Sequence, residues 1–332
     1  MYCHGGGYST GSPLYARTLT TKLASQLSMD VFCFDYRLAP EHPYPAAVDD
    51  AQTAWDFLML QGYGAKDIFV AGDSAGGNLA LALGLRLKKQ KRMLPAGFVL
   101  MSPWTDLTVS GKTHVTKADV DPVLNQNYLN EMIENYVPQA KKVQMEAVKP
   151  LQEAGTLQEG NTIRAAGTLQ EGNTIQAAGT LQEGNILQAA DTLREANALQ
   201  EGNIIRAAGT LQERNTLQTA NTLQTAGTEK QKPGDKSANK VFEEIFDTEY
   251  LRNPEISPLF GDFTGFPPTY IQVGDLEVLM SDSTMLQKKM SGEGVAVSLD
   301  TYKNMWHVFQ MGPFKTAVEA IHKCGEFIYS VQ

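Results

Sequence analysis

The sequence predicts a doubly wound, mostly parallel α/β sheet with helices on both faces. Short apolar runs that suit buried strands alternate along the chain with segments whose apolar residues recur at helical spacing. Glycine ends two of these runs, as expected where a strand turns directly into a helix. Hydrophobic residues make up 42% of the 332 residues, which is ample for a large buried core.

The amino-terminal elements follow from local patterns. Ser12 and Pro13 supply an N-cap and a first-turn proline, and Leu19, Leu23 and Leu27 give the following helix its apolar face. Strands and helices then alternate, which favours parallel pairing of the strands. The predicted elements are a helix over 13–27, a strand over 31–34, a helix around 48–58, a strand over 68–71, a helix to about residue 88 and a strand over 98–101.

One strand-to-helix turn carries a candidate nucleophile. Gly72-x-Ser74-x-Gly76 matches the nucleophile elbow, a tight and strained turn that exposes a serine hydroxyl at the carboxyl edge of a sheet. The free N–H groups of the following helix favour negative charge there. An ordinary glycine-rich turn between a strand and a helix would give the same pattern. The pattern therefore indicates a nucleophile only if suitable partners occur elsewhere in the chain.

A second glycine-rich loop lies at the amino terminus. Gly5, Gly6 and Gly7 follow His4. Glycines present backbone N–H groups without side-chain obstruction, and acyl transfer needs such donors where the tetrahedral oxyanion forms. We expect His4 to brace this loop by hydrogen bonding rather than to act as a base.

Two loops of the carboxyl-terminal third carry candidate partners for Ser74. The loop after the strand predicted over 295–302 carries His307, a candidate general base. A carboxylate after the preceding strand suits the group that orients such a histidine. The order serine, acid, histidine is that of enzymes with a nucleophile elbow. Three carboxylates follow the strand predicted over 267–274: Asp275, Glu277 and Asp282.

Four motifs in this order give the chain a specific resemblance. It resembles the hormone-sensitive-lipase-like carboxylesterases of the α/β-hydrolase fold, over residues 1–143 and about 240–332. The motifs are His-Gly-Gly-Gly at 4–7, Asp-Tyr-Arg-Leu-Ala-Pro-Glu at 35–41, Gly-Asp-Ser-Ala-Gly-Gly at 72–77 and Ser-Pro-Trp-Thr-Asp-Leu at 102–107.

The resemblance implies roles for particular residues. The N–H groups of Gly5, Gly6 and Ala75 would form the oxyanion hole. The family pattern of an acid followed by x-Leu fits Glu277, which makes it the chosen triad acid, with Asp275 as its rival and Asp282 as a helix cap. Trp104 and Asp106 would shape the site and its loop. The family also implies small short-acyl or aryl esters as substrates, with no cofactor and no metal.

The resemblance also predicts how the chain is divided. Family members carry strands and cap helices ahead of the glycine motif, which here begins at residue 4, so we expect an amino-terminally truncated core with an exposed sheet edge. The predicted parts are the first part of the hydrolase core over 1–107, a partial cap segment over 108–150, a repeat insertion over 151–228, a linker over 229–239 and the second part of the core over 240–332.

The insertion consists of thirteen six-residue units, each begun by leucine or isoleucine. Six residues advance a helix by 600°, so these side chains would form no single helical stripe, whereas in extended structure they would share one face. Recurring glycine and asparagine lower the β propensity. We therefore favour a disordered low-complexity insertion, with a hexapeptide β-solenoid as the alternative.

Composition limits the partners and the compartment. The net charge of −9, with no basic cluster, argues against binding to nucleic acid or an anionic membrane surface. No apolar run approaches the roughly 18 to 20 residues that span a bilayer, and the start of the chain lacks the pattern of a signal peptide. Three widely spaced cysteines suggest reduced thiols, so we expect a cytoplasmic protein. An edge strand or the last helix could support a homodimer.

The sequence thus predicts a serine carboxylesterase that acts on a small-molecule ester. Two alternatives stay open at this stage. The plant gibberellin receptors resemble the same family but have lost the catalytic histidine and bind a small ligand without turning it over. An inactive truncated product with an expanded repeat is the other alternative. The presence of both Ser74 and His307 favours the enzyme.

Overall fold

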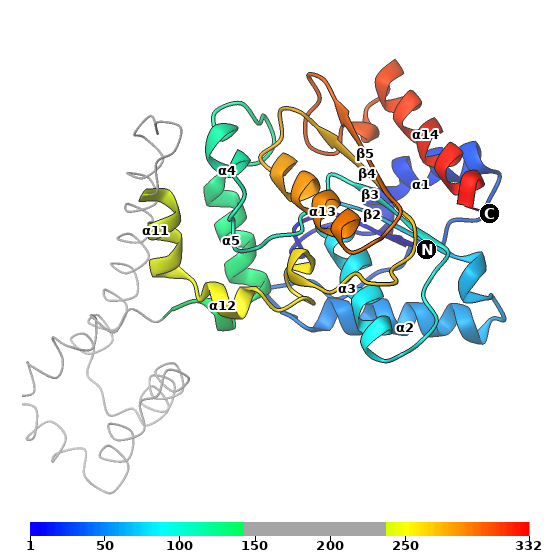
Figure 1. The fold of residues 1–332 in the computed structure, drawn as a ribbon, viewed down its shortest axis with the longest axis horizontal. Coiled ribbons are helices and arrows are strands. Elements are labelled where there is room, and N and C mark those ends of the chain that lie inside the picture. The colour runs from blue at the N-terminus through cyan, green and yellow to red at the C-terminus, as the bar shows by residue number, and fades with distance from the viewer. Residues whose placement is uncertain (143–236, 332) are drawn as a thin grey trace, which may run out of the picture. The chain divides into compact units, whose positions relative to one another are not determined.

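A computed structural model describes residues 1–142 and 237–331 (Figure 1). Both stretches belong to one compact unit. The repeat predicted over 151–228 and nearly all of the linker predicted over 229–239 lie outside the described residues. The first three residues of the helix Ser237–Ile245 are the part of that linker that is described.

The described part of the chain contains a five-stranded sheet in which every pair of neighbours is parallel. The pairing of Ala71 with Val99, and of Tyr270 with Ser298, illustrates its register. In the order in which they lie, the strands are β1 (Tyr2–Cys3), β2 (Phe69–Asp73), β3 (Gly97–Met101), β4 (Thr269–Gly274) and β5 (Val297–Tyr302). All of their carboxyl ends therefore meet at one edge of the sheet.

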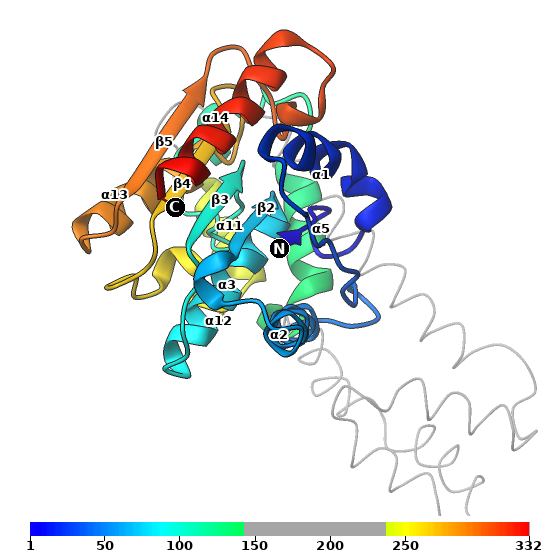
Figure 2. The ribbon, with the colours of Figure 1, turned by 90° about the vertical axis from the view of Figure 1, so that its right-hand side faces the viewer.

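Helices cover both faces of this sheet, as predicted (Figures 1 and 2). Alternate residues of the strands face opposite layers: in β3, Phe98 and Leu100 lie in the apolar cluster beneath one helical layer, whereas Val99 and Met101 lie in the cluster beneath the other. The first layer contains α2 (Ala46–Leu60), α3 (Ala75–Lys89) and α13 (Met280–Gly292), and the second contains α1 (Pro13–Leu27) and α14 (Lys315–Val331).

The strand predicted over 31–34 is reduced to a single bridge. Cys33 bridges Tyr2 in parallel, and the Tyr2 N–H donates to the Phe32 carbonyl over 2.8 Å. Because the partner strand β1 is two residues long, it offers too few groups for a longer ladder. The bridge still places residues 31–34 on the side of β1 opposite β2, so the winding reverses here and α1 and α2 cover different faces.

The segment predicted as a partial cap, residues 108–150, is described as far as residue 142. It contains the short helix α4 (Thr113–Thr116) and the amphipathic helix α5 (Gln126–Tyr136), whose N-cap Asn125 accepts from the Tyr128 N–H. On the return, α11 (Ser237–Ile245) and α12 (Thr248–Leu251) follow, and an antiparallel bridge joins Lys141 to Phe246. The role of these helices as a cap stays a prediction.

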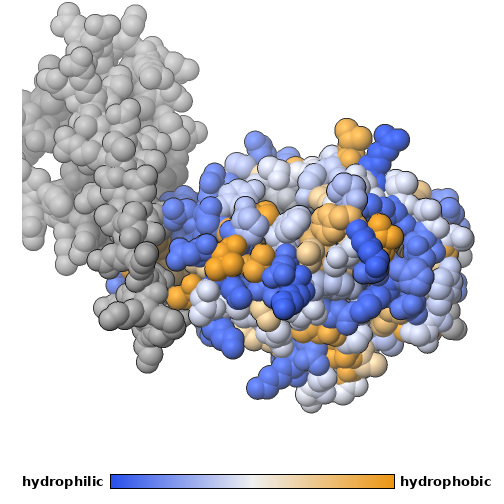
Figure 3. Space-filling model, turned by 90° about the horizontal axis from the view of Figure 1, so that it is seen from above, coloured by the Kyte–Doolittle hydropathy of each residue, from blue (hydrophilic) through white to orange (hydrophobic). Residues whose placement is uncertain are grey.

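The surface of the described residues carries both apolar and polar side chains. On the face seen in Figure 3, apolar side chains form separate patches among polar and charged ones. No helix in the described ranges is both long enough and apolar enough to cross a membrane.

Candidate active site

The turn between β2 and α3 has the strained geometry of a nucleophile elbow. Ser74 has φ 54° and ψ −124°, in the positive-φ region that residues other than glycine rarely adopt. A side chain at Gly76 would collide with the carbonyl oxygens of Cys3 and His4, and one at Gly72 would collide with the backbone of Gly76. The close approach of these backbones explains why the pattern needs glycine on both sides of Ser74.

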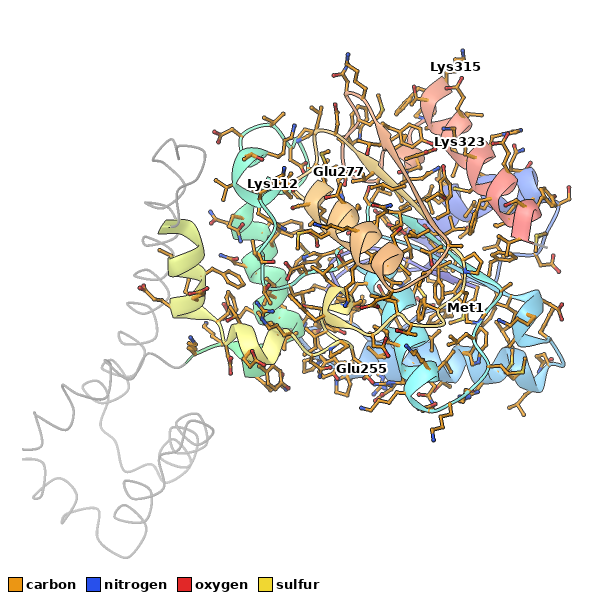
Figure 4. The ribbon with its side chains drawn as sticks, in the orientation of Figure 1. Met1, Lys112, Glu255, Glu277, Lys315 and Lys323 are labelled. Atoms are coloured by element: carbon orange, nitrogen blue, oxygen red, sulfur yellow. The ribbon has the colours of Figure 1, made fainter. Side chains whose placement is uncertain are left out.

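The structure brings Ser74, Glu277 and His307 together from three separate loops. His307 Nε2 lies 2.9 Å from Ser74 Oγ, and His307 Nδ1 lies 3.0 Å from Glu277 Oε2. Glu277 is fully buried and His307 is 8% exposed. Glu277 lies in the loop before α13, close to α4 in the view of Figure 4.

These contacts favour one tautomer of the neutral imidazole. A carboxylate only accepts hydrogen bonds, so Glu277 favours the tautomer with the proton on Nδ1. In that tautomer the Nε2 lone pair faces the Ser74 hydroxyl, which can donate to it. The arrangement is that of a base oriented to remove the hydroxyl proton.

A hydroxyl that the sequence analysis did not single out completes the shell around Glu277. Ser102 Oγ donates to Glu277 Oε1 over 2.8 Å and accepts from the Val308 N–H over 3.2 Å. The Gly274 N–H also donates to Glu277 Oε1. Ser102 therefore links the acid to the residue that follows His307. Its place at the carboxyl end of a buried strand, as the first residue of the motif at 102–107, was the available signal.

The other two carboxylates of this region have different contacts. Asp275 Oδ1 accepts from the backbone N–H of Asn304 over 2.7 Å. The expectation that Asp282 caps a helix is wrong, because α13 has Leu279 as its N-cap. Asp282 Oδ2 instead accepts from two backbone N–H groups, those of Thr105 and Asp106, at 2.9 Å each.

Asp282 also forms a buried pair with His114 that the sequence analysis missed. His114 Nε2 lies 3.0 Å from Asp282 Oδ1, and both side chains are almost fully buried. Burial raises the pKa of Asp282, and the hydrogen bond from His114 opposes this shift. The pair joins α4 to α13, next to the loop that carries Glu277. Its two members lie 168 residues apart in the chain, so no local pattern could reveal it.

The glycine loop departs from the prediction at Gly5. Its N–H donates to Asp73 Oδ1 over 3.0 Å, so it is not free to bind an oxyanion. Among the described residues, the N–H groups of Gly6, Gly7 and Ala75 have no protein acceptor. Gly5 therefore fastens the loop to the elbow, and the next glycines hold the free donors.

Asp73 and His4 hold this loop in place. Asp73 is fully buried, and its Oδ1 also accepts from the Tyr2 hydroxyl over 2.7 Å, whereas Oδ2 has no hydrogen-bond partner among the described residues. Burial raises the pKa of Asp73, and the two hydrogen bonds oppose this shift. His4 Nδ1 lies 2.9 Å from the Gly5 carbonyl oxygen, the hydrogen bond expected of a brace, and burial lowers the pKa of His4.

The loop after β3 is shaped by Asp106, as the resemblance implied. Its two oxygens accept from the backbone N–H groups of Thr108 and Ser110 and from both hydroxyls. Trp104 is buried, and its backbone N–H donates to the Ser74 carbonyl over 3.1 Å. Within the described ranges, no cluster of three or more histidine, cysteine or carboxylate side chains is arranged to hold a metal ion.

Comparison with known proteins assigns the chain to a family. A family model described as alpha/beta hydrolase fold matches residues 1–166 and 184–311, so the chain belongs to this family. The chain is similar to an esterase of Acinetobacter venetianus, with 29% identity over 333 aligned positions that cover all of this chain and 74% of the relative. It is also similar to an acetyl-hydrolase of Streptomyces hygroscopicus, with 39% identity over 137 positions, 41% of this chain and 46% of the relative.

A solved structure indicates which branch of the alpha/beta hydrolases the chain is similar to. The chain is similar to a hormone-sensitive lipase from a metagenome library, with 30% identity and a TM-score of 0.64, covering all of this chain and 77% of that one. The predicted likeness to the hormone-sensitive-lipase-like esterases is therefore confirmed. The class that these matches define is that of carboxylic ester hydrolases.

Proposed function

We propose that the chain hydrolyses small esters with short acyl or aryl groups through an acyl-enzyme. The observation that carries this proposal is the pair of consecutive hydrogen-bond contacts from Ser74 to His307 and from His307 to Glu277, at 2.9 and 3.0 Å. Neither contact alone would activate an alcohol, but together they give the hydroxyl a base of fixed tautomer and orientation.

In the first half of the reaction, Ser74 Oγ attacks the ester carbonyl carbon and its proton passes to His307 Nε2. The carbonyl π electrons move to the oxygen and form a tetrahedral oxyanion. When this collapses, the bond to the alcohol oxygen breaks, and the leaving alkoxide takes the proton from Nε2. Glu277 stabilises the charged imidazole between the two proton transfers.

In the second half, water replaces the alcohol. His307 Nε2 removes a proton from the water while the water oxygen attacks the acyl carbon. When the second tetrahedral intermediate collapses, the bond from Ser74 Oγ to the acyl carbon breaks, and Nε2 gives this proton to Ser74 Oγ as the acid leaves. Both halves pass through an oxyanion. We propose that Gly6, Gly7 and Ala75 donate to it, because their N–H groups have no acceptor among the described residues, whereas that of Gly5 is bound to Asp73.

The preference for short acyl groups is supported by the relatives. The Streptomyces protein is named for acetyl hydrolysis, and it aligns with 41% of this chain. A chain-length series of p-nitrophenyl esters from acetate to decanoate tests this preference. We expect kcat/KM to be highest for the acetate and butyrate esters and to fall for longer chains.

Substitution of the nucleophile tests the reaction itself. The Ser74→Ala variant should hydrolyse p-nitrophenyl butyrate with kcat lowered by about 10⁴- to 10⁶-fold, because no covalent intermediate can form. It should also escape labelling by a fluorophosphonate, which reacts with activated serines. Ser298→Ala, which removes an exposed hydroxyl on β5, is the matched control and should behave as wild type.

Two results would contradict the proposal. The first is wild-type turnover by the Ser74→Ala variant. The second is a folded wild-type chain that neither hydrolyses the ester series nor takes up the fluorophosphonate. That second result would favour a ligand-binding protein of the same fold.

A further inference from the structure

Helix α1 supplies an ammonium group to the loop that carries His307. Lys22 Nζ donates to the carbonyl oxygens of Gln310, Met311 and Gly312, over 2.9, 3.2 and 2.8 Å. These three residues form the end of a single 3₁₀ turn, Phe309–Met311, and the residue after it. The turn begins two residues after His307, whereas Lys22 lies almost 300 residues earlier in the chain.

Three converging carbonyls need a cation or several donors. The last carbonyls of a helical turn have no partners within the turn and carry partial negative charge. A lysine ammonium has three protons, so it can satisfy all three oxygens at once. Burial lowers the pKa of Lys22, which is consistent with an ammonium that has exchanged part of its water shell for these carbonyls.

Two further long-range hydrogen bonds hold the described residues that directly follow His307, residues 308–312, and both are neutral. The Val308 N–H donates to Ser102 Oγ, and Gln310 Nε2 donates to Gln272 Oε1 over 3.1 Å. The buried ring of Phe309 packs with Ala317 and Ala320 of α14. Lys22 therefore adds a charged anchor to residues 308–312 from α1, a different element from those that carry Ser102, Gln272, Ala317 and Ala320.

We propose that Lys22 is a positioning residue for the reaction, whose ammonium gathers the three carbonyls and thereby keeps His307 within hydrogen-bonding distance of Ser74. This inference rests on the proposed role of His307 as the general base. A displacement of a catalytic group by about 1 Å can lower a rate by about 100-fold, so a loose loop would be visible in the kinetics.

The Lys22→Ala variant tests this role. We expect kcat for p-nitrophenyl butyrate to fall by about 10- to 100-fold, with KM nearly unchanged, because His307 loses its position while the substrate contacts remain. The rate of fluorophosphonate labelling of Ser74 should fall by a similar factor. Circular dichroism and the melting temperature show whether the variant is folded.

A small amine should restore what the substitution removes. Propylammonium matches the atoms lost in Lys22→Ala, and Lys22 itself lines an open groove of about 630 Å³ between α1 and α14. We expect propylammonium chloride to raise the labelling rate of Lys22→Ala several-fold. Tetramethylammonium chloride at equal ionic strength should not, because it has no N–H donors. The labelling rate is the better readout, since an amine could also attack an acyl-enzyme.

Two further variants separate charge from packing. Lys22→Arg keeps a cation with several N–H donors, so it should retain most of the activity. Lys66→Ala is the matched control, because Lys66 Nζ also donates to a backbone carbonyl, that of Pro95, over 3.3 Å, but in a loop away from His307. It should leave both kcat and the labelling rate unchanged.

The inference would be overturned if Lys22→Ala were folded and kept kcat within about twofold of wild type. It would also be overturned by a loss that neither Lys22→Arg nor propylammonium relieves, because such a loss would come from packing and not from charge. Both results presuppose an active wild-type chain. An inactive, unlabelled wild type would instead refute the proposed function.

Discussion

Glu277 and Asp275 lie two residues apart after β4, yet their side chains have different partners. Both oxygens of Glu277 are engaged, one by His307 and the other by Ser102 and a backbone N–H. Asp275 instead accepts from the backbone of Asn304. At the scale of single residues, the contact with the imidazole lets Glu277 fix the tautomer of His307, whereas Asp275 holds the backbone of a loop.

This difference predicts opposite outcomes for two matched substitutions. Glu277→Gln keeps the size of the side chain but favours the wrong tautomer of His307, so kcat should fall by about 10³- to 10⁴-fold. Asp275→Asn can still accept from Asn304 and should stay close to wild type. The measurement is kcat for p-nitrophenyl butyrate with both purified variants. The reverse ranking would transfer the role of the acid to Asp275.

The candidate residues were largely predictable from sequence, whereas their supporting contacts were not. Ser74 and His307 stand in local settings, an elbow and a post-strand loop, that can be recognised along the chain. Ser102 opens the motif at 102–107, but its contact with Glu277, 175 residues away, becomes visible only in the fold. The involvement of the Gly5 N–H with Asp73 is likewise a contact between distant segments.

At the scale of elements, Asp73 joins the end of β2 to β1 and to the glycine loop. It accepts from Tyr2 in β1 and from the Gly5 N–H, so one carboxylate fixes the loop against the elbow. The carboxylate is fully buried, and one of its oxygens has no hydrogen-bond partner in the part of the chain that the structure describes. A buried carboxylate of this kind makes the free energy of unfolding depend on pH.

The Asp73→Asn variant should reveal this dependence. Because the folded-state pKa is raised above 3.8, the native state binds more protons than the unfolded state between that value and the raised one. The contribution of protonated Asp73 is therefore present at low pH and lost as the pH rises through the native pKa. Asparagine does not ionise, and its Oδ1 can still accept from Tyr2 and Gly5.

We expect the melting temperature of Asp73→Asn, relative to wild type, to increase as the pH rises from about 4 towards 7. Differential scanning calorimetry across this range measures the difference. Asp119→Asn, which changes an exposed carboxylate, is the control. A melting-temperature difference that is constant over the range would show that Asp73 does not titrate differently in the two states.

Most elements were predictable because their causes are local. The capped helix α1 spans Pro13–Leu27, with Ser12 as its N-cap, and α2 spans Ala46–Leu60 around the predicted apolar stripe. The strand predicted over 31–34 is reduced to a single bridge for a reason that is not local. Those residues have the apolar pattern of a strand, but strand pairing also depends on the length of the neighbour, and β1 is only two residues long.

At the scale of the whole molecule, the end of the first described stretch, residues 140–142, pairs with residues 245–247 of the second. The Lys142 N–H donates to the Ile245 carbonyl over 2.7 Å, and the Asp247 N–H donates to the Ala140 carbonyl over 2.6 Å. The first described stretch therefore ends beside the carboxyl end of α11, and the second begins at the amino end of that helix, about 12 Å away. A short connection could join such ends with a modest entropic penalty.

A deletion tests whether the repeat contributes to catalysis. We expect replacement of residues 151–228 by a glycine-serine linker of about eight residues to keep kcat/KM and the melting temperature close to those of the full chain. The described contacts of Ser74, Glu277 and His307 all lie within residues 1–142 and 237–331. A deletion variant that is folded but inactive would give the repeat a part in the reaction.

The sequence by itself determined the alternation of strands and helices, the elbow and the order of the serine, acid and histidine, because each has a cause within a few neighbouring residues. Only the tertiary structure decided which carboxylate faces His307, which glycine N–H groups are free, and that Ser102 and Lys22 hold the surrounding loops. These are contacts between residues far apart in the chain. Their partners depend on how the strands are ordered and how the helices pack, which no local pattern specifies.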